Sequence, residues 1–217
     1  MKYKNNIAIF ISGKGSNMRE LIKKSLYCSA KIKLIFANKN CYGLQVAKKY
    51  DIPIYFYESK NFYSKFQFEK KILKLLEKHN VNWIFLAGFM YIFSNFIIKK
   101  FKGKIINIHP SLLPNYKGLN THYRVLKDKQ KYHGVTIHLI TEKIDEGPII
   151  LQAKTKINSN ENENSLSQKV LKIEHLLYPS VMVSIVNGYL KIFNDKISWI
   201  NKSCLPKEGK NNIIYIK

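Results

Sequence analysis

Hydrophobic and polar positions follow two different periods along the first half of the chain. Short runs with apolar residues at every position, or at every second position, predict buried strands. Longer runs with apolar residues three or four positions apart predict amphipathic helices. The predicted strands cover residues 7–12, 31–37, 53–57, 81–87 and 104–109. The predicted helices lie between them, over residues 17–29, 43–50, 62–79 and 94–101.

The second half follows a less regular pattern. Proline and glycine in residues 110–120 and polar residues in 158–164 predict two loops. Ser165, with Gln168 three positions later, is typical of a capping box that opens a final long helix. The other predicted elements are a helix over 121–129, strands over 132–141 and 149–157 around a turn at 145–148, a hairpin over 189–199 and an irregular tail over 201–217.

Strands that alternate with helices of this length are typical of an α/β fold. We expect a mainly parallel twisted sheet with helices on both faces, followed by the C-terminal hairpin. With 46% hydrophobic residues the chain can bury a substantial core. Because neither an internal repeat nor a second core is visible, we expect a single domain over residues 1–217.

The formal net charge of +23 raises the question of nucleic-acid binding. Only two of the 37 basic residues are arginines, Arg19 and Arg124, and the lysines are spread along the whole chain. Specific readers of bases and phosphates favour arginine because its planar fork forms paired hydrogen bonds. The composition therefore favours a solvated lysine surface, without a specific nucleic-acid partner.

Other features of the sequence indicate a soluble cytoplasmic protein. No apolar run is long enough to cross a bilayer, so we expect no membrane partner. The apolar stretch over 7–11 is shorter than the core of a signal peptide. Cys28, Cys41 and Cys204 show neither metal-ligand nor redox spacing, so we interpret them as reduced and structural.

A glycine-rich segment, Gly13-Lys14-Gly15-Ser16-Asn17, joins the first predicted strand to the first predicted helix. Ligands of such sheets bind at this end of the strands, where glycine permits close approach and backbone N–H groups attract anions. The segment lacks the full glycine pattern of a dinucleotide or triphosphate loop. Taken alone, it is explained equally well as a tight turn capped by Ser16 or Asn17.

Two polar residues end the fifth predicted strand. Alternation places Asn107 and His109 on one face and Ile108 on the other, and Pro110 then ends the strand. Such a pair could stabilise an oxyanion. A histidine that only satisfies loop carbonyls is a slightly better interpretation on local grounds.

Asp145 lies in an Asp-Glu-Gly-Pro turn, where an aspartate usually caps its own turn. A catalytic role would require it to reach His109 or a neighbouring water. The remaining histidines show no metal-ligand spacing, so no metal site is predicted, and His133 and His138 are interpreted as packed in or beside a strand.

Several segments together carry a resemblance to a known family. Asn107-Ile-His-Pro-Ser-Leu-Leu-Pro114 resembles the signature of the folate-dependent formyltransferases. The accompanying segments are Ser12 to Asn17, Leu86-Ala-Gly-Phe-Met90, His133-Gly-Val-Thr-Ile-His138 and Asp145-Glu-Gly-Pro148. They follow the family's order and spacing, and the resemblance covers roughly residues 7–200. It implies a Rossmann-like formyltransferase fold.

The resemblance also implies an activity. The formyl group of the co-substrate 10-formyltetrahydrofolate would pass to the amine of glycinamide ribonucleotide, a step of de novo purine biosynthesis, without a metal or a covalent enzyme intermediate. The partners would be these two small molecules. Residues of about 1–103 would form the nucleotide-binding half, and residues of about 104–200 the catalytic and folate-binding half. The oligomeric state expected is a monomer or a homodimer.

The resemblance assigns roles to individual residues. Asn107 and His109 would stabilise the oxyanion, while Asp145 would favour protonated His109 and help to move the amine proton through water. The residues implied to bind the ribonucleotide are Gly15, Ser16, Asn17, Leu171, Lys172, Ile173 and Glu174. The residues implied to line the folate pocket are Lys65, Met90, Tyr91, Ile92, Phe93, Asn107, Thr141, Glu142, Lys143, Ile144 and Asp145.

Two positions depart from the family pattern. Tyr91 follows the Gly-Phe-Met segment, where close relatives often carry arginine. Lys65 stands where an arginine is expected to meet the folate tail, and lysine lacks the paired carboxylate recognition of arginine. These departures concern folate binding rather than the catalytic residues.

The same catalytic trio occurs in two rival members of the family. Methionyl-tRNA formyltransferases carry an additional C-terminal barrel, for which we expect this chain to be too short. Formyltetrahydrofolate deformylases carry a preceding regulatory domain, whereas the first strand is predicted here from residue 7. A non-enzymatic, lysine-rich nucleic-acid-binding protein is the alternative of a different class, and a filter-binding assay with unrelated DNA would distinguish it.

Overall fold

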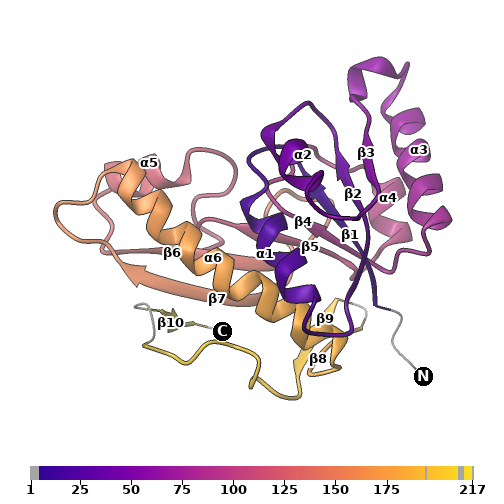
Figure 1. Cartoon of the computed structure of the whole chain (residues 1–217). Helices are drawn as coiled ribbons and strands as arrows, with labels where there is room; N and C mark the ends of the chain where they lie inside the picture. The colour runs from indigo at the N-terminus through magenta and orange to yellow at the C-terminus, as the bar shows by residue number, and fades with distance from the viewer. Residues whose placement is uncertain (1–4, 194, 210–212, 217) are drawn as a thin grey trace.

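A computed structural model describes residues 5–193, 195–209 and 213–216 (Figure 1). Eight strands form one sheet in the order β10-β7-β6-β5-β4-β1-β2-β3. The strands are β1 (Asn6–Ile11), β2 (Lys31–Ala37), β3 (Ile54–Phe56), β4 (Trp83–Leu86), β5 (Ile105–His109), β6 (Tyr132–Leu139), β7 (Ile149–Lys156) and β10 (Ile214–Tyr215). The helices are α1 (Ser16–Ser25), α2 (Tyr42–Ala47), α3 (Lys65–Lys78), α4 (Asn95–Lys100), α5 (Thr121–Lys127) and α6 (Glu163–Val186), with a 3₁₀ turn η1 (Ser59–Asn61).

Strands β3, β2, β1, β4 and β5 run parallel, and β6, β7 and β10 pair antiparallel along one edge. Alternate residues of β1 enter two separate cores. Ile7, Ile9 and Ile11 pack with residues of α1, α2 and α6, whereas Ala8 and Phe10 pack with residues of α3 and α4. Helices therefore cover both faces (Figure 1), which confirms the predicted fold class.

The elements predicted in the first half form in the predicted order, with shifted ends. The largest shift is at the C-terminal end of α1, which was expected to reach residue 29 and ends at Ser25. Helix α3 was expected from residue 62 and begins at Lys65. Ser64 caps it by accepting a hydrogen bond from the Gln67 N–H at 3.2 Å. Phe66, in the first turn of α3, is 53% exposed.

The long helix α6 begins two residues before the predicted capping box. Asn162 is the N-cap and accepts a hydrogen bond from the Ser165 N–H at 2.9 Å, while Ser165 accepts one from the Asn162 N–H at 3.0 Å. The prediction of a capping box formed by Ser165 and Gln168 was therefore wrong. No helix in the described part of the chain is both long and apolar enough to span a membrane.

The C-terminal hairpin is confirmed as β8 (Leu190–Phe193) and β9 (Lys196–Trp199), which pair antiparallel. The tail was expected to be irregular throughout. Instead, residues 214 and 215 form β10 and extend the main sheet by pairing with Lys154 and Ala153 of β7. Other residues of the tail, 210–212 and 217, lie outside the described part.

The topology brings three loops to one edge of the sheet. Strands β1, β4 and β5 are parallel neighbours, so their carboxyl ends lie side by side. The Ser12 N–H donates to the Gly88 carbonyl at 3.1 Å, which joins the loops after β1 and β4 directly. The glycine turn, the segment over 88–94 and the end of β5 at His109 thus occupy one edge, where ligands of such sheets bind.

Candidate active site

The glycine turn after β1 depends on two glycines. Gly15 has a φ of 75° and is the N-cap of α1. A Cβ at Gly15 would lie 2.9 Å from the Gly43 Cα, and the Gly43 N–H donates to the Gly13 carbonyl at 2.9 Å. The alternative of a Ser16 or Asn17 cap was wrong, because α1 begins at Ser16 and has no side-chain cap.

The start of α1 is suited to an anion. The first four N–H groups of any helix lack partners within the helix, and its dipole makes this end positive. The first turn of α1 contains no acidic residue, and the side chain of the preceding Lys14 is exposed. The turn therefore offers backbone donors and a nearby positive charge.

Two residues implied to bind the same substrate are in contact across the molecule. Asn17 of α1 donates from Nδ2 to Oε2 of Glu174 on α6 at 2.6 Å, and the pair is buried. One helical turn later, the hydroxyl of Tyr178 lies 2.9 Å from the Leu86 carbonyl and 2.8 Å from that of Ile106. Tyr178 thus fixes α6 on the sheet, and Glu174 is positioned with it.

Burial raises the pKa of the Glu174 carboxyl to about 7, and the hydrogen bond from Asn17 only partly opposes this shift. The folded state therefore holds the Glu174 proton more tightly than the unfolded state. The resulting stabilisation is fully present below the ordinary glutamate pKa of 4.5 and is lost as the pH rises to about 7.

We expect Glu174→Gln to remove this pH dependence. At pH 8 the free energy of unfolding of the variant should exceed that of the parent by on the order of 3 kcal/mol, because a neutral amide replaces a buried charge. At pH 5 the two should be nearly equal. Urea unfolding at both pH values measures this, with Glu77→Gln at an exposed position as the control. An identical pH dependence of stability in the parent and in Glu174→Gln would contradict the raised pKa of the Glu174 carboxyl.

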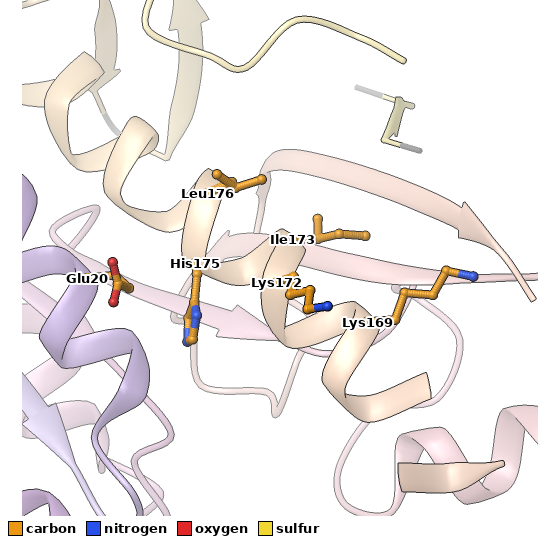
Figure 2. A pocket seen from close by; sticks show the side chains of 6 residues that line it. All are labelled: Glu20, Lys169, Lys172, Ile173, His175 and Leu176. Atoms are coloured by element: carbon orange, nitrogen blue, oxygen red, sulfur yellow. The ribbon is translucent and has the colours of Figure 1, made fainter. Parts of the chain in front are cut away.

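The other residues of α6 implied to bind the ribonucleotide do not share this contact. Ile173 is buried in the core that α1, α2 and α6 form on one face of the sheet. Lys172 lines a cavity of about 410 Å³ beside α1 and α6, together with Glu20 and His175 (Figure 2). Because Lys172 and Glu174 are two positions apart on a helix, their side chains point in nearly opposite directions. Leu171 is half-buried. Glu174 is thus the member of this group that hydrogen-bonds to Asn17.

The polar residues at the end of β5 lie beside β6 and the turn before β7. Asn107 is directly opposite His138 in the sheet, and its Nδ2 lies 3.2 Å from His138 Nε2. His109 Nδ1 lies 3.6 Å from Asp145 Oδ2, and both side chains are almost fully buried. The structure therefore brings Asn107, His109 and Asp145 together.

The protonation of His138 follows from its partners. Its Nδ1 lies 2.9 Å from the Leu139 carbonyl, which only accepts, so Nδ1 carries the hydrogen. Burial lowers the pKa of His138, against the opposing effects of Leu139 and Asp145. The neutral ring then accepts at Nε2 from Asn107, which fixes the orientation of the Asn107 amide. Its second N–H remains available.

His109 is held through one ring nitrogen. Its Nε2 lies 2.9 Å from the Tyr116 carbonyl and therefore donates to it. The 3.6 Å between Nδ1 and Asp145 is an ion-pair distance, too long for a hydrogen bond. The Nδ1 side of the protonated ring can therefore donate to a further oxygen, from a ligand or a water.

The Asp145 side chain makes its contacts outside its own turn. Its Oδ2 accepts a hydrogen bond from the Gly118 N–H at 2.8 Å, from the distant loop over 110–120. Its Oδ1 lies 3.7 Å from His138 Nε2. Gly147 lets the turn fold back, since a Cβ there would lie 1.7 Å from the Leu139 carbonyl. A carboxylate is thus fixed beside both histidines.

The segment after β4 is held from two sides. Ser12 Oγ accepts from the Met90 N–H at 2.7 Å. On the other side the buried Glu69 carboxylate accepts from the Ser94 N–H at 2.7 Å, from the Ser94 hydroxyl, and from the Tyr91 hydroxyl at 3.2 Å. Burial, with the nearby Glu69, raises the pKa of Tyr91, so its phenol stays protonated.

The residues implied to line a folate pocket divide by exposure. Met90 and Ile92 are more than half exposed, whereas the Phe93 side chain is packed in the core that α3 and α4 form on the other face of the sheet. Lys65 is exposed, with Nζ 5.5 Å from the Tyr91 ring centroid. In the turn before β7, the Thr141 hydroxyl donates to the Lys143 carbonyl at 3.3 Å, and Glu142, Lys143 and Ile144 are exposed.

The sequence did not indicate the contacts of Glu69 or His138. Glu69 sits in an amphipathic helix whose neighbouring charges are exposed, so no local signal marks it as buried. His138 was interpreted only as packed, but alternation along β6 places it on the same face as Thr136. In the sheet, His138 lies opposite Asn107 and Thr136 lies opposite His109. His133 does fit simple packing: it is buried and hydrogen-bonded to His122 at 3.0 Å, and burial lowers its pKa to about 3.

Comparison with known proteins defines the class first. The profile of the formyl transferase family matches residues 5–182, and the chain belongs to this family. More particularly, it is 32% identical over 94% of its length to a phosphoribosylglycinamide formyltransferase of Escherichia coli, covering 97% of that protein. It is 36% identical over 95% of its length to one of Haemophilus influenzae, covering 98% of it.

A solved structure agrees with this similarity. The structure of a phosphoribosylglycinamide formyltransferase of Coxiella burnetii superimposes with a TM-score of 0.86 at 34% identity, covering 90% of this chain and 93% of that one. The agreement extends over nearly the whole described fold.

Proposed function

We propose that the chain transfers the formyl group of 10-formyltetrahydrofolate to the amine of glycinamide ribonucleotide, giving N-formylglycinamide ribonucleotide and tetrahydrofolate in de novo purine biosynthesis. The observation that carries the proposal is the cluster of Asn107, His109 and Asp145 on the same sheet edge as the glycine turn. The names of the full-length relatives support this choice of acceptor.

The bond-forming step follows from the free donors of the cluster. The amine nitrogen attacks the formyl carbon, and the carbonyl oxygen gains negative charge. The second N–H of Asn107 and the Nδ1–H of protonated His109 are the two donors left for this oxygen. Because they are fixed before the reaction, stabilising the charge requires little reorganisation.

The proton and the leaving group complete the reaction. The attacking amine loses its proton to Asp145 through a water, since direct contact is not required for such transfer. The bond between the formyl carbon and N10 of the folate then breaks, and the proton that Asp145 received passes through water to N10 as tetrahydrofolate leaves. Asp145 is a carboxylate again at the end of the cycle, with Oδ2 3.6 Å from His109 Nδ1.

The substrates are assigned to opposite sides of this cluster. The ribonucleotide phosphate would lie against Gly15, Ser16 and Asn17, with Glu174 near the glycinamide or ribose end. The folate would lie between the segment over 90–93 and the turn over 141–145, with Lys65 near its tail. The backbone donors of α1 support the first assignment, and the exposed Met90 and Ile92 support the second.

The proposal needs two small-molecule substrates and no metal, nucleic acid or membrane. We place the chain in the cytoplasm, as a monomer or homodimer. Any association of its lysine surface with DNA should be sequence-independent and should weaken steeply as salt rises.

The direct test is to incubate the chain with 10-formyltetrahydrofolate and glycinamide ribonucleotide. Absorbance follows the release of tetrahydrofolate, and mass spectrometry detects the formylated ribonucleotide. Equal amounts of the two products are expected. Folate turnover without formylated ribonucleotide would refute the proposed acceptor.

Gly15→Val should damage ribonucleotide binding selectively. The substitution places a branched side chain at a φ of 75° and into the Gly43 backbone, so it closes the approach to the turn. We expect the KM for the ribonucleotide to rise far more than the KM for the folate in steady-state assays. Gly13→Ala is the control, since its Cβ would meet nothing within 4 Å. Equal effects on both substrates would contradict the placement.

A further inference from the structure

The loop over 110–120 supplies two backbone groups to the catalytic cluster. The Tyr116 carbonyl accepts from His109 Nε2 at 2.9 Å, and the Gly118 N–H donates to Asp145 Oδ2 at 2.8 Å. The position of this loop therefore decides which His109 nitrogen carries hydrogen and where the Asp145 carboxylate lies.

The backbone of this loop is in an unfavourable conformation. Tyr116 has a φ of 56° and Asn120 one of 55°, on either side of Gly118 at 75°. A bulky residue such as tyrosine rarely adopts positive φ, at a cost on the order of 1 kcal/mol or more. Such a segment keeps one conformation only when other contacts hold it there.

The holding contacts come from Arg124 on α5. Its Nη1 donates to the Lys117 carbonyl at 2.7 Å and lies 3.4 Å from the Leu119 carbonyl. Its guanidinium carbon lies 5.4 Å from the centroid of the Tyr116 ring. The Tyr116 hydroxyl donates to Asp128 Oδ2 at 2.9 Å, just beyond the end of α5. The half-buried Arg124 side chain thus binds the loop on both sides of Gly118 and at Tyr116.

We infer that Arg124 is a positioning residue, which holds the loop so that the Tyr116 carbonyl and the Gly118 N–H fix His109 and Asp145 for the reaction. For its effect on turnover, the inference rests on the proposed function. A lysine cannot replace Arg124, because only the planar guanidinium can donate in its plane to carbonyls while its face lies against an aromatic ring. This explains an arginine here in a chain that otherwise relies on lysine.

The test compares Arg124→Lys with Arg19→Lys, the only other arginine, which is exposed and paired with Glu20 on α1. Arg124→Lys should lower kcat by about ten-fold to a hundred-fold, the range for a small misplacement of catalytic groups, with the KM for the ribonucleotide nearly unchanged. Arg19→Lys should keep both constants. Unchanged kcat in Arg124→Lys would overturn the inference.

A second readout requires neither substrate. Nitrogen-15 NMR of the neutral His109 ring should show hydrogen on Nε2 in the parent and in Arg19→Lys, and a mixture of both tautomers in Arg124→Lys. If the parent lacks transferase activity, this arm still tests the positioning role. Should Arg124→Lys fail to fold by circular dichroism, Tyr116→Phe removes the Asp128 contact and should shift the tautomer mixture in the same direction. A single Nε2–H tautomer in the folded variants would overturn the inference.

Discussion

Replacing His109 by alanine is expected to lower kcat by about two orders of magnitude or more, the range for loss of an oxyanion donor. Negative charge develops on the formyl oxygen only during attack, so the Nδ1–H contributes little to the bound ground state. Both KM values should therefore stay nearly constant. Steady-state kinetics with each substrate varied in turn measures the effect on kcat separately from the effects on the two KM values.

The control for this variant is His79→Ala. His79 follows α3 and hydrogen-bonds to the Tyr55 hydroxyl at 2.8 Å, far along the chain from the cluster. Its replacement should leave kcat unchanged. Turnover of His109→Ala close to that of the parent would remove His109 from the reaction.

Asp145→Asn has the second large expected effect, a loss of roughly two orders of magnitude or more in kcat. Asparagine tolerates the φ of 53° at this position and can still accept from the Gly118 N–H. The change therefore removes the charge and keeps the shape. The imidazolium of His109 loses its partner, and the amine proton loses its acceptor.

The two interpretations of Asp145 predict different results. If Asp145 serves only to hold the loop through Gly118, Asp145→Asn should be almost as active as the parent. If it moves the proton, kcat falls while thermal unfolding stays near the parental temperature. Asp51→Asn, at an exposed position, is the matched control and should retain full activity.

Local periodicity was sufficient to predict most of the fold. The buried run of β1 and the amphipathic pattern of α1 indicate their own structure, because one or both faces are buried in the core. Ends were less predictable: Ser64 and Asn162, each a polar residue among several, are the caps that set the starts of α3 and α6. The pairing of residues 214 and 215 with β7 depends on a distant strand, so no local pattern indicated it.

The site was predictable where residues are close in sequence or match a family segment. Asn107 and His109 lie at the end of one strand, and alternation along that strand predicted that they share one face. The contacts that define their chemistry join distant segments: Asn107 meets His138, His109 meets Tyr116, and Asn17 meets Glu174. Spacing along a chain carries no signal for such contacts. The roles of these residues therefore stay predictions until the variants are measured.

The central claim is that the amine of glycinamide ribonucleotide is the acceptor. The most direct measurement compares the rate of tetrahydrofolate release from 10-formyltetrahydrofolate in buffer alone, with methionyl-tRNA and with glycinamide ribonucleotide. The account predicts that release depends on the ribonucleotide and is negligible with tRNA or water alone. Release at the same rate in buffer alone would instead indicate a deformylase, and release that requires methionyl-tRNA would indicate a tRNA formyltransferase.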